Sequence, residues 1–211
     1  QPKSIYGGGQ IFTPEDYALY KDVTERLKAV VEDTFGLVGG GDGGSRGLSD
    51  LHFTAPTFIT REVGDEEWRP TTMHDEYWHP HVDKNNTGHY DYSGLVYLST
   101  LGEDFGPGGE LHFYPDSSLD CAKFVDPVDP GPCAVIGPAE LIVEPRRGRL
   151  IVFGSGRENP HRVTRVEKGT RYVLSFWFTC DKRMRFKTFL DGKVHKEYAR
   201  KEVRTGDPEE L

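Results

Sequence analysis

Two stretches of sequence decide how this chain folds and what it can hold: Tyr77-Trp78-His79-Pro80-His81-Val82-Asp83, and Glu158-Asn159-Pro160-His161, which runs on to Gly169-Thr170-Arg171. In an extended strand, residues i and i+2 share a face, so the imidazole of His81 and the carboxylate of Asp83 can point at one spot. His161 can supply a third ligand from the second stretch. The two stretches therefore predict a metal site in a β-rich chain.

The ligand types indicate which metal this site would take. Two neutral imidazoles and one carboxylate on one side of a metal leave the opposite positions open, as in the facial triad of non-haem Fe(II) oxygenases. Arg171 follows His161 within a β-pattern run. Its permanently charged, planar fork can hold one end of a dicarboxylate while the other end chelates the metal.

The other histidines near the first stretch offer an alternative, a zinc cluster. Its members would be His74, His79, His81 and His89. Only His81 is followed two residues later by a carboxylate, and Pro80 prevents a helix from gathering the others. We therefore predict that His81, Asp83 and His161 hold iron, and that the remaining three histidines lie on the surface or at the rim of a substrate site.

Taken together, these motifs resemble a known family. The chain from about residue 74 to residue 182 is similar to the Fe(II)/2-oxoglutarate-dependent dioxygenases of the prolyl and lysyl hydroxylase group. Residues 77–84 and 91–98 look like the membrane-anchored 2-oxoglutarate and iron-dependent oxygenase-domain proteins. Residues 155–161 look equally like the prolyl 3-hydroxylases (leprecans). An HxD motif alone is common by chance, but HxD with a distant histidine and a following arginine is specific.

The resemblance implies a fold, which is mainly β: a double-stranded β-helix, that is, a cupin-like jelly roll. We expect its core at residues 51–182. Residues 1–50 would form an N-terminal helix that buttresses one sheet and a glycine-rich connector, and residues 183–211 a C-terminal extension. The helix start is legible directly, because Thr13-Pro14-Glu15-Asp16 combines an N-cap hydroxyl, a proline and two acids.

The strands are predicted from local patterns. Residues 51–60 are expected to form one strand, followed by an acidic turn at residues 62–67, and further strands are expected at residues 93–100, 139–144 and 148–153. From Arg171 onward, alternation predicts a strand that is buried on both faces. Its inner face carries Arg171, Ser175 and Trp177. An unpaired buried guanidinium is too costly for a plain core, so this face implies a bound anion.

The resemblance assigns further residues to the co-substrate pocket. Tyr97 falls where the family places a tyrosine that joins the arginine at the distal carboxylate. Trp177 and Ser175 match the pocket wall in register, and Leu111 of the Gly-Gly-x-Leu element is a further wall residue. The expected co-substrate-binding set is therefore Arg171, Tyr97, Trp177, Ser175 and Leu111.

The implied activity is hydroxylation of a peptidyl residue, most simply proline, with release of succinate and CO2. Its cofactors and co-substrates would be Fe(II), 2-oxoglutarate and O2, with ascorbate as reductant, and its partner a peptide or protein. Alternatives are a lysyl or small-molecule substrate, or a catalytically silent metal-binding module. The formal charge of −8 argues against a nucleic-acid substrate.

The remaining features bear on context. Residues 117–138 depart from the family pattern and are expected to form an inserted, proline-rich loop. Cys121 and Cys133 bracket part of it and could pair in an oxidising compartment, which would leave Cys180 outside the pair.

No run of 18 apolar residues suggests a membrane span, and no start resembles a signal peptide. The family resemblance favours the endoplasmic reticulum or secretory pathway, and the last four residues, Pro208-Glu209-Glu210-Leu211, are similar to a retention tail.

Overall fold

The computed structural model of the chain describes residues 13–37, 51–55, 57–65, 79–115, 119–120, 134–135 and 137–186. The helices are α1 (Pro14–Thr34) and α2 (Asp83–Asn86), and a 3₁₀ turn spans Lys182–Met184. The strands are β1 (His52–Phe53), β2 (Phe58–Gly64), β3 (Tyr92–Tyr97), β4 (Leu111–Phe113), β5 (Leu119–Asp120), β6 (Ala134–Val135), β7 (Leu141–Val143), β8 (Leu150–Gly154), β9 (His161–Val163) and β10 (Gly169–Thr179). Among the described residues, no helix has both the length and the apolar character needed to cross a bilayer.

Helix α1 begins where its sequence predicts. The Thr13 hydroxyl accepts a hydrogen bond from the Asp16 amide at 3.2 Å, and the Asp16 carboxylate accepts one from the Thr13 amide at 2.7 Å. This reciprocal capping box satisfies amides that the first helical turn leaves without partners. Helix α1 and the strands belong to separate compact units, so the predicted buttressing of a sheet stays a prediction.

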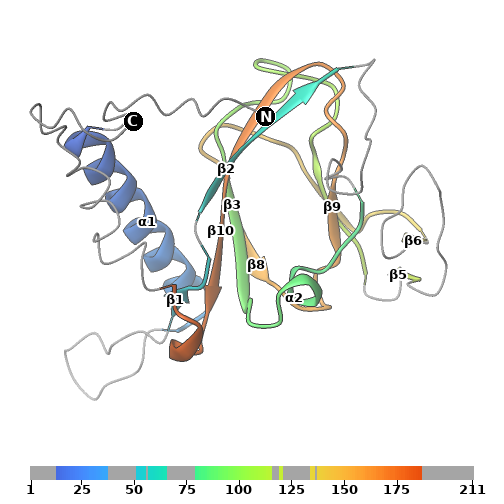
Figure 1. Ribbon diagram of the computed structural model, residues 1–211. Coiled ribbons are helices and arrows are strands. Elements are labelled where there is room, and N and C mark those ends of the chain that lie inside the picture. The colour runs from blue at the N-terminus through green and yellow to red at the C-terminus, as the bar shows by residue number, and fades with distance from the viewer. Residues whose placement is uncertain are drawn as a thin grey trace, which may run out of the picture. The chain divides into compact units, whose positions relative to one another are not determined.

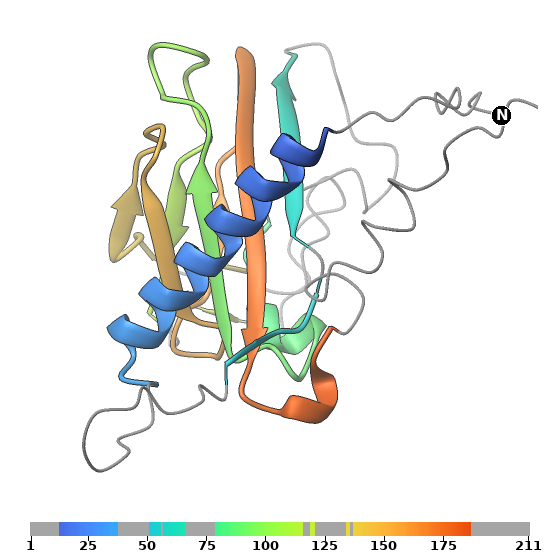
Figure 2. The same ribbon diagram turned by 90° about the vertical axis from the view of Figure 1, so that its left-hand side faces the viewer.

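The larger sheet is centred on β10, the longest strand. Strands β1 and β2 pair with one edge of β10, β3 pairs with its other edge, and β8 pairs with β3, all antiparallel. Figure 2 shows β10 between β2 and β3. The register sets Arg171 opposite Glu62 of β2 and Val173 opposite Tyr97 of β3. These cross-strand neighbours point to the same face of the sheet.

The smaller sheet has the order β7-β4-β9 and lies on the other side of the unit (Figure 1). From β3 onward the chain passes between the two sheets: β3 in the larger sheet, β4 and β7 in the smaller, β8 in the larger, β9 in the smaller and β10 in the larger. Side chains from both sheets form the core between them, namely Leu95, Leu111, Phe113, Val143, Ile151, Phe153 and Val163. This is the predicted double-stranded β-helix.

Four local predictions are wrong. The strand predicted at residues 51–60 is broken into β1 and β2, and Glu62 lies within β2 instead of in an acidic turn. Asp83 does not lie in a strand, because it opens the short helix α2. The insertion at residues 117–138 contains strand pairing despite its prolines, since β5 pairs with β6. Residues 39–47, Cys121 and Cys133 lie outside the described residues, as does the chain after residue 186.

Candidate active site

The two histidines of the predicted triad are brought together by backbone pairing. The His81 amide donates to the His161 carbonyl and the His161 amide donates to the His81 carbonyl, both at 2.9 Å. His81 thereby extends the smaller sheet beyond β9, although it lies outside any named strand. The two imidazole rings lie 4.4 Å apart between centroids. Residues distant in sequence are thus fixed side by side by two hydrogen bonds.

Asp83 reaches the same point from the first residue of α2, which lies at one end of the space between the sheets (Figure 1). The amide of the next residue, Lys84, donates to the carbonyl of Ser155 at 2.9 Å and anchors this helix to the end of β8. Asp83 Oδ1 lies 3.4 Å from His81 Nε2 and 3.9 Å from His161 Nε2. One ligand atom from each of the three residues lies within 4.8 Å of the others, so the three atoms are close enough to hold one metal ion.

Both imidazoles are oriented in the same way. His81 Nδ1 donates to the His79 carbonyl at 3.1 Å, and His161 Nδ1 donates to the Asn159 carbonyl at 2.9 Å. A carbonyl can only accept, so each Nδ1 carries the hydrogen and each neutral ring presents a lone pair at Nε2. The Nε2 atoms are the ones that face Asp83, and such hydrogen bonds on the far nitrogen are typical of metal-bound histidines.

Trp177 of β10 contacts the Asp83 carboxylate from the larger sheet, whereas His161 belongs to the smaller sheet. Its indole Nε1 donates to Asp83 Oδ2 at 3.2 Å, whereas Asp83 Oδ1 faces the two histidines. The indole stacks on Tyr90 with centroids 5.4 Å apart and meets the edge of Phe58 at 5.7 Å. The sequence placed Trp177 on the pocket wall. The structure adds a direct contact with a predicted metal ligand.

The electrostatics of the cluster suit metal binding. Burial raises the pKa of Asp83, but the interactions of its carboxylate with His81, His161 and Ser93 outweigh burial and hold this pKa well below its ordinary value. Burial, with a smaller effect from His81, lowers the pKa of His161 to about 4. Burial also lowers the pKa of His81, but Asp83 outweighs it and the net shift is upward. Asp83 is therefore ionised and His161 neutral near pH 7, the forms that bind metal.

A second polar cluster lies on the same face of β10, around Arg171. This side chain is buried, with 2% exposed, and its Nη1 donates to Glu62 Oε2. Within the described part of the chain, Arg171 Nε, Arg171 Nη2 and the Tyr97 hydroxyl are buried without a hydrogen-bond partner. The guanidinium carbon lies 5.3 Å from the centre of the Tyr97 ring. Buried polar atoms without partners are costly, so this cluster has the chemistry of an anion-binding site.

Burial dominates the titration of both groups beside the guanidinium. It raises the pKa of Glu62, against the opposing charge and hydrogen bond of Arg171. Burial likewise raises the pKa of Tyr97, and Arg171 again opposes the shift. The Tyr97 hydroxyl therefore keeps its hydrogen near pH 7 and can donate it to an anion.

A glycine packs against the stem of Arg171. Gly109 has φ +81°, and a Cβ there would lie 2.9 Å from Arg171 Cδ and 2.7 Å from the ring of Phe105. Both the backbone conformation and the space therefore require glycine at the second position of the Gly-Gly-x-Leu element.

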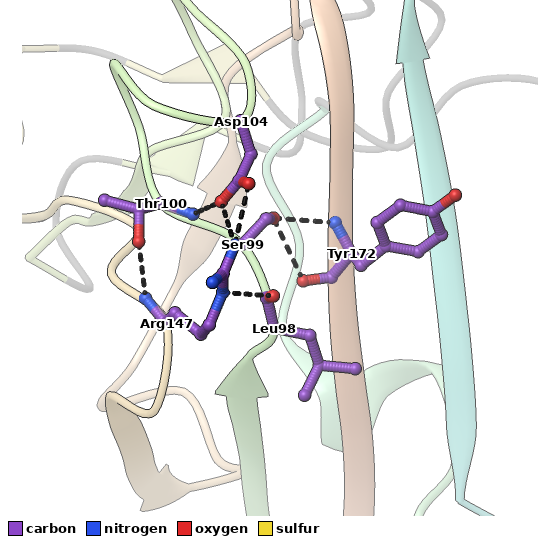
Figure 3. A network of polar contacts seen from close by, with 6 residues as sticks. All are labelled: Leu98, Ser99, Thr100, Asp104, Arg147 and Tyr172. Carbon is purple, nitrogen blue, oxygen red and sulfur yellow. Dashed lines mark hydrogen bonds and ion pairs between the residues drawn. The ribbon is translucent and has the colours of Figure 1, made fainter.

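A network of polar contacts holds the strand next to Arg171 (Figure 3). Its members are Leu98, Ser99, Thr100, Asp104, Arg147 and Tyr172. The Ser99 hydroxyl accepts from the Tyr172 amide at 2.8 Å, and Arg147 Nη2 contacts both carboxylate oxygens of Asp104, at 2.7 and 2.9 Å. Because Tyr172 follows Arg171 directly, the network extends the pairing of β10 past the end of β3 and fixes the backbone that carries the guanidinium.

The structure brings most of the predicted site residues to one interior. Leu111 is buried in the core on β4, and Ser175 is half-buried on β10 between Phe58 and Leu95. His79 and His89 lie outside the metal-binding cluster of the described residues, and His74 is not among those residues. The roles of Arg171, Tyr97, Trp177, Ser175 and Leu111 toward a co-substrate stay predictions.

Sequence reasoning missed Glu62. Its signal would have been the alternation of β2, which places Phe58, Thr60 and Glu62 on one face. That alternation identifies the face of the strand but not its register against β10. The pairing of Glu62 with Arg171 could therefore not be predicted from the sequence.

The two clusters fit the groups that the sequence implies. The donor set of His81, Asp83 and His161 is that of an open-sided iron site, and the atoms without partners on Arg171 and Tyr97 are hydrogen-bond donors that suit a carboxylate. A family model described as the 2OG-Fe(II) oxygenase superfamily, where 2OG is 2-oxoglutarate, matches residues 70–179, more than half of the chain. The chain belongs to this superfamily.

Relatives of the oxygenase agree with that assignment. It is 39% identical over 171 residues to the human 2-oxoglutarate and iron-dependent oxygenase domain-containing protein 3, covering 81% of this chain and 43% of that protein. It is 35% identical over 103 residues to human prolyl 3-hydroxylase 3, covering 49% of this chain and 11% of that protein. The chain thus spans less than half the length of these relatives.

A solved structure is also similar: the 2OG complex of a viral collagen prolyl hydroxylase from Paramecium bursaria Chlorella virus-1. It is 14% identical with a TM-score of 0.48, covering 81% of this chain and 78% of that chain. Membership of the superfamily implies that the oxygenase uses Fe(II), 2-oxoglutarate and O2.

Proposed function

We propose that this oxygenase hydroxylates a prolyl residue in a peptide or protein, with release of succinate and CO2. The carrying observation is the arrangement of two clusters on one interior. Trp177 joins β10 to the triad through Asp83, and Arg171 lies on the same face of that strand with donors that have no partner among the described residues. A site of this kind can hold a metal at one end and a dicarboxylate at the other.

The residues of the chain would bind and orient the reactants. Iron would be held by His81 Nε2, His161 Nε2 and Asp83 Oδ1, while Trp177 would keep the second oxygen of Asp83 engaged. The distal carboxylate of 2-oxoglutarate would lie against Arg171. When bound, the iron supplies the oxidation chemistry and the protein supplies position and electrostatics.

The choice of proline rests on the relatives. Prolyl 3-hydroxylases of human and chicken are among the proteins to which the chain is similar. The human protein that matches over more of the chain is named only for its oxygenase domain. A lysyl or small-molecule substrate is therefore the alternative that the experiment has to separate from proline.

The test is incubation with Fe(II), 2-oxoglutarate and ascorbate under ¹⁸O₂, using three matched peptide sets. The sets differ at a single position that carries proline, lysine or alanine. Succinate is quantified and the peptides are analysed by mass spectrometry. A gain of one labelled oxygen on proline alone supports the proposal. A gain on lysine alone makes the protein a lysyl hydroxylase, and uncoupled succinate with every peptide favours a small-molecule substrate.

Two variants control the assignment. Asp83→Ala removes the carboxylate that lies near both histidines and should abolish succinate production. A wild-type rate of succinate production from this variant would refute the triad. His79→Ala removes a neighbouring imidazole, whose centroid lies 5.9 Å from that of His81. It keeps the backbone carbonyl that orients His81 and should retain iron and turnover. Loss of iron from His79→Ala would favour the zinc cluster instead.

We further propose that ascorbate serves as the reductant and that the protein works in the endoplasmic reticulum or secretory pathway. Support for both comes from the family resemblance. Omission of ascorbate should shorten the period of linear succinate production. Fractionation of cells that express the full-length protein should place it with lumenal markers, and recovery in the cytosol would refute the location.

A further inference from the structure

The guanidinium of Arg171 forms an ion pair with a carboxylate of the protein itself. Arg171 and Glu62 are direct cross-strand partners on β10 and β2, and Arg171 Nη1 donates to Glu62 Oε2. Both side chains are largely buried, with 2% of Arg171 and 13% of Glu62 exposed. A cation at this depth is tolerated only with a partner, and Glu62 supplies one.

Glu62 uses only one corner of the fork. Nη1 is engaged, whereas Nε and Nη2 have no partner within the described part of the chain. The Nε hydrogen and one Nη2 hydrogen point the same way, so this edge can bind both oxygens of a carboxylate. The Tyr97 hydroxyl is equally buried and lacks a partner among the described residues, and the Tyr97 ring adjoins the guanidinium. Glu62 thus binds Nη1 and leaves Nε and Nη2, the two donors that a second carboxylate would use.

The charges on the two edges compete. Arg171 and ionised Glu62 together are neutral, so a dianion arriving at the free edge makes the buried cluster net negative. Two carboxylates on one guanidinium repel each other strongly in a poorly solvated site. The same Glu62 also holds the guanidinium in place, because its contact fixes Nη1 and leaves Nε and Nη2 without a hydrogen-bond partner among the described residues.

We propose that Glu62 is a positioning residue that sets the affinity for the co-substrate: its hydrogen bond aims the Nε–Nη2 edge of Arg171, and its charge weakens binding of the distal carboxylate. The inference rests on the proposed function, because it takes 2-oxoglutarate as the ligand of Arg171. It concerns a residue that the triad and the pocket wall do not include.

Two variants separate the two effects. Glu62→Gln keeps an oxygen that can accept from Nη1 and removes the charge, so it should bind 2-oxoglutarate about ten-fold more tightly than wild type. Glu62→Ala removes charge and hydrogen bond together, so it should bind at least about ten-fold more weakly than Glu62→Gln. Glu167→Gln is the matched control, since it removes one acid at an exposed position. Its affinity should equal that of wild type.

The measurement is isothermal titration calorimetry with Mn(II) in place of iron, so that no turnover occurs. Circular dichroism first verifies that each variant is folded. The ligands are 2-oxoglutarate and 2-oxopentanoate, which has the same chain length without the distal carboxylate. The effect of Glu62→Gln should appear with 2-oxoglutarate and vanish with 2-oxopentanoate.

Four results would overturn the inference. Glu62→Gln affinity within two-fold of wild type would show that the charge is irrelevant. Equal affinities of Glu62→Gln and Glu62→Ala would remove the positioning role. An equal gain with 2-oxopentanoate would show that the effect does not pass through the distal carboxylate. Wild-type protein that binds no 2-oxoglutarate would instead overturn the proposed function together with this inference.

Discussion

Replacing Trp177 with phenylalanine should weaken iron binding without dismantling the site. The indole Nε1 lies 3.2 Å from Asp83 Oδ2 and is a donor to a predicted metal ligand. Phenylalanine keeps an aromatic ring against Tyr90, where the rings now stack at 5.4 Å, and removes only the donor and one ring. Loss of a hydrogen-bonding partner of a metal ligand typically costs about 10–100-fold in metal affinity, equivalent to about 1.4–2.7 kcal/mol.

The assay is anaerobic competition for Fe(II) against a chromophoric chelator, with thermal unfolding recorded in parallel. Tyr90→Phe is the control: it retains the stacked ring and leaves the indole donor in place, so its iron affinity should match wild type. The constant for 2-oxoglutarate at saturating iron should change less than the iron constant, because Arg171 forms the other cluster. Iron affinity of Trp177→Phe within two-fold of wild type, in a folded protein, would refute the supporting role of the indole.

Three further changes test other parts of the structure. Arg171→Ala should raise the apparent constant for 2-oxoglutarate at saturating iron by about thirty-fold or more, since truncating one partner of a buried charge-assisted pair costs about 2–5 kcal/mol, while iron affinity stays unchanged. An unchanged constant would mean that the co-substrate is held elsewhere. Burial raises the pKa of Asp91, but the Lys84 ammonium, the Cys180 amide and the Thr179 hydroxyl outweigh burial and lower this pKa from its ordinary value. Asp91→Asn should therefore lose about 1–3 kcal/mol of unfolding free energy at pH 7, and the gap should close as the pH falls through the lowered pKa, as measured by urea unfolding across pH. A gap that is independent of pH would contradict the ionic contribution. Gly94→Ala would place a Cβ 2.3 Å from the ring of Phe176 and should cost about 1–3 kcal/mol in the same urea assay, whereas wild-type stability would show that the ring moves freely.

Several features could be predicted from the sequence because they depend on residues close together in the chain or on residue type. The capping box at Thr13 and Asp16 needs only residues three apart, so the start of α1 could be read directly. The alternation from Arg171 to Phe178 likewise predicted β10, because the strand period of two is a property of the backbone. The pattern around His81, Asp83, His161 and Arg171 predicted a site for iron and a dicarboxylate, since few residue combinations suit both.

The structure brings the three predicted ligands together, but through a local backbone that differs from the predicted one. The sequence pattern placed His81 and Asp83 on one face of a strand, but Asp83 opens α2 and turns back toward the histidines. The spacing of two residues is compatible with both backbones. Which of the two forms depends on contacts outside the motif, such as the bond from the Lys84 amide to the Ser155 carbonyl.

Only the tertiary structure decided which groups meet across the site. The pairing of His81 with His161, of Glu62 with Arg171 and of Trp177 with Asp83 joins segments that are far apart in the chain. A strand's own sequence determines which side chains share a face, but its register against a neighbour is set by packing of the whole sheet. The predicted metal ligands and the predicted anion-binding arginine are therefore legible from residue types and spacing, whereas the contact of Glu62 with that arginine and of the Trp177 indole with Asp83 follows from the tertiary fold.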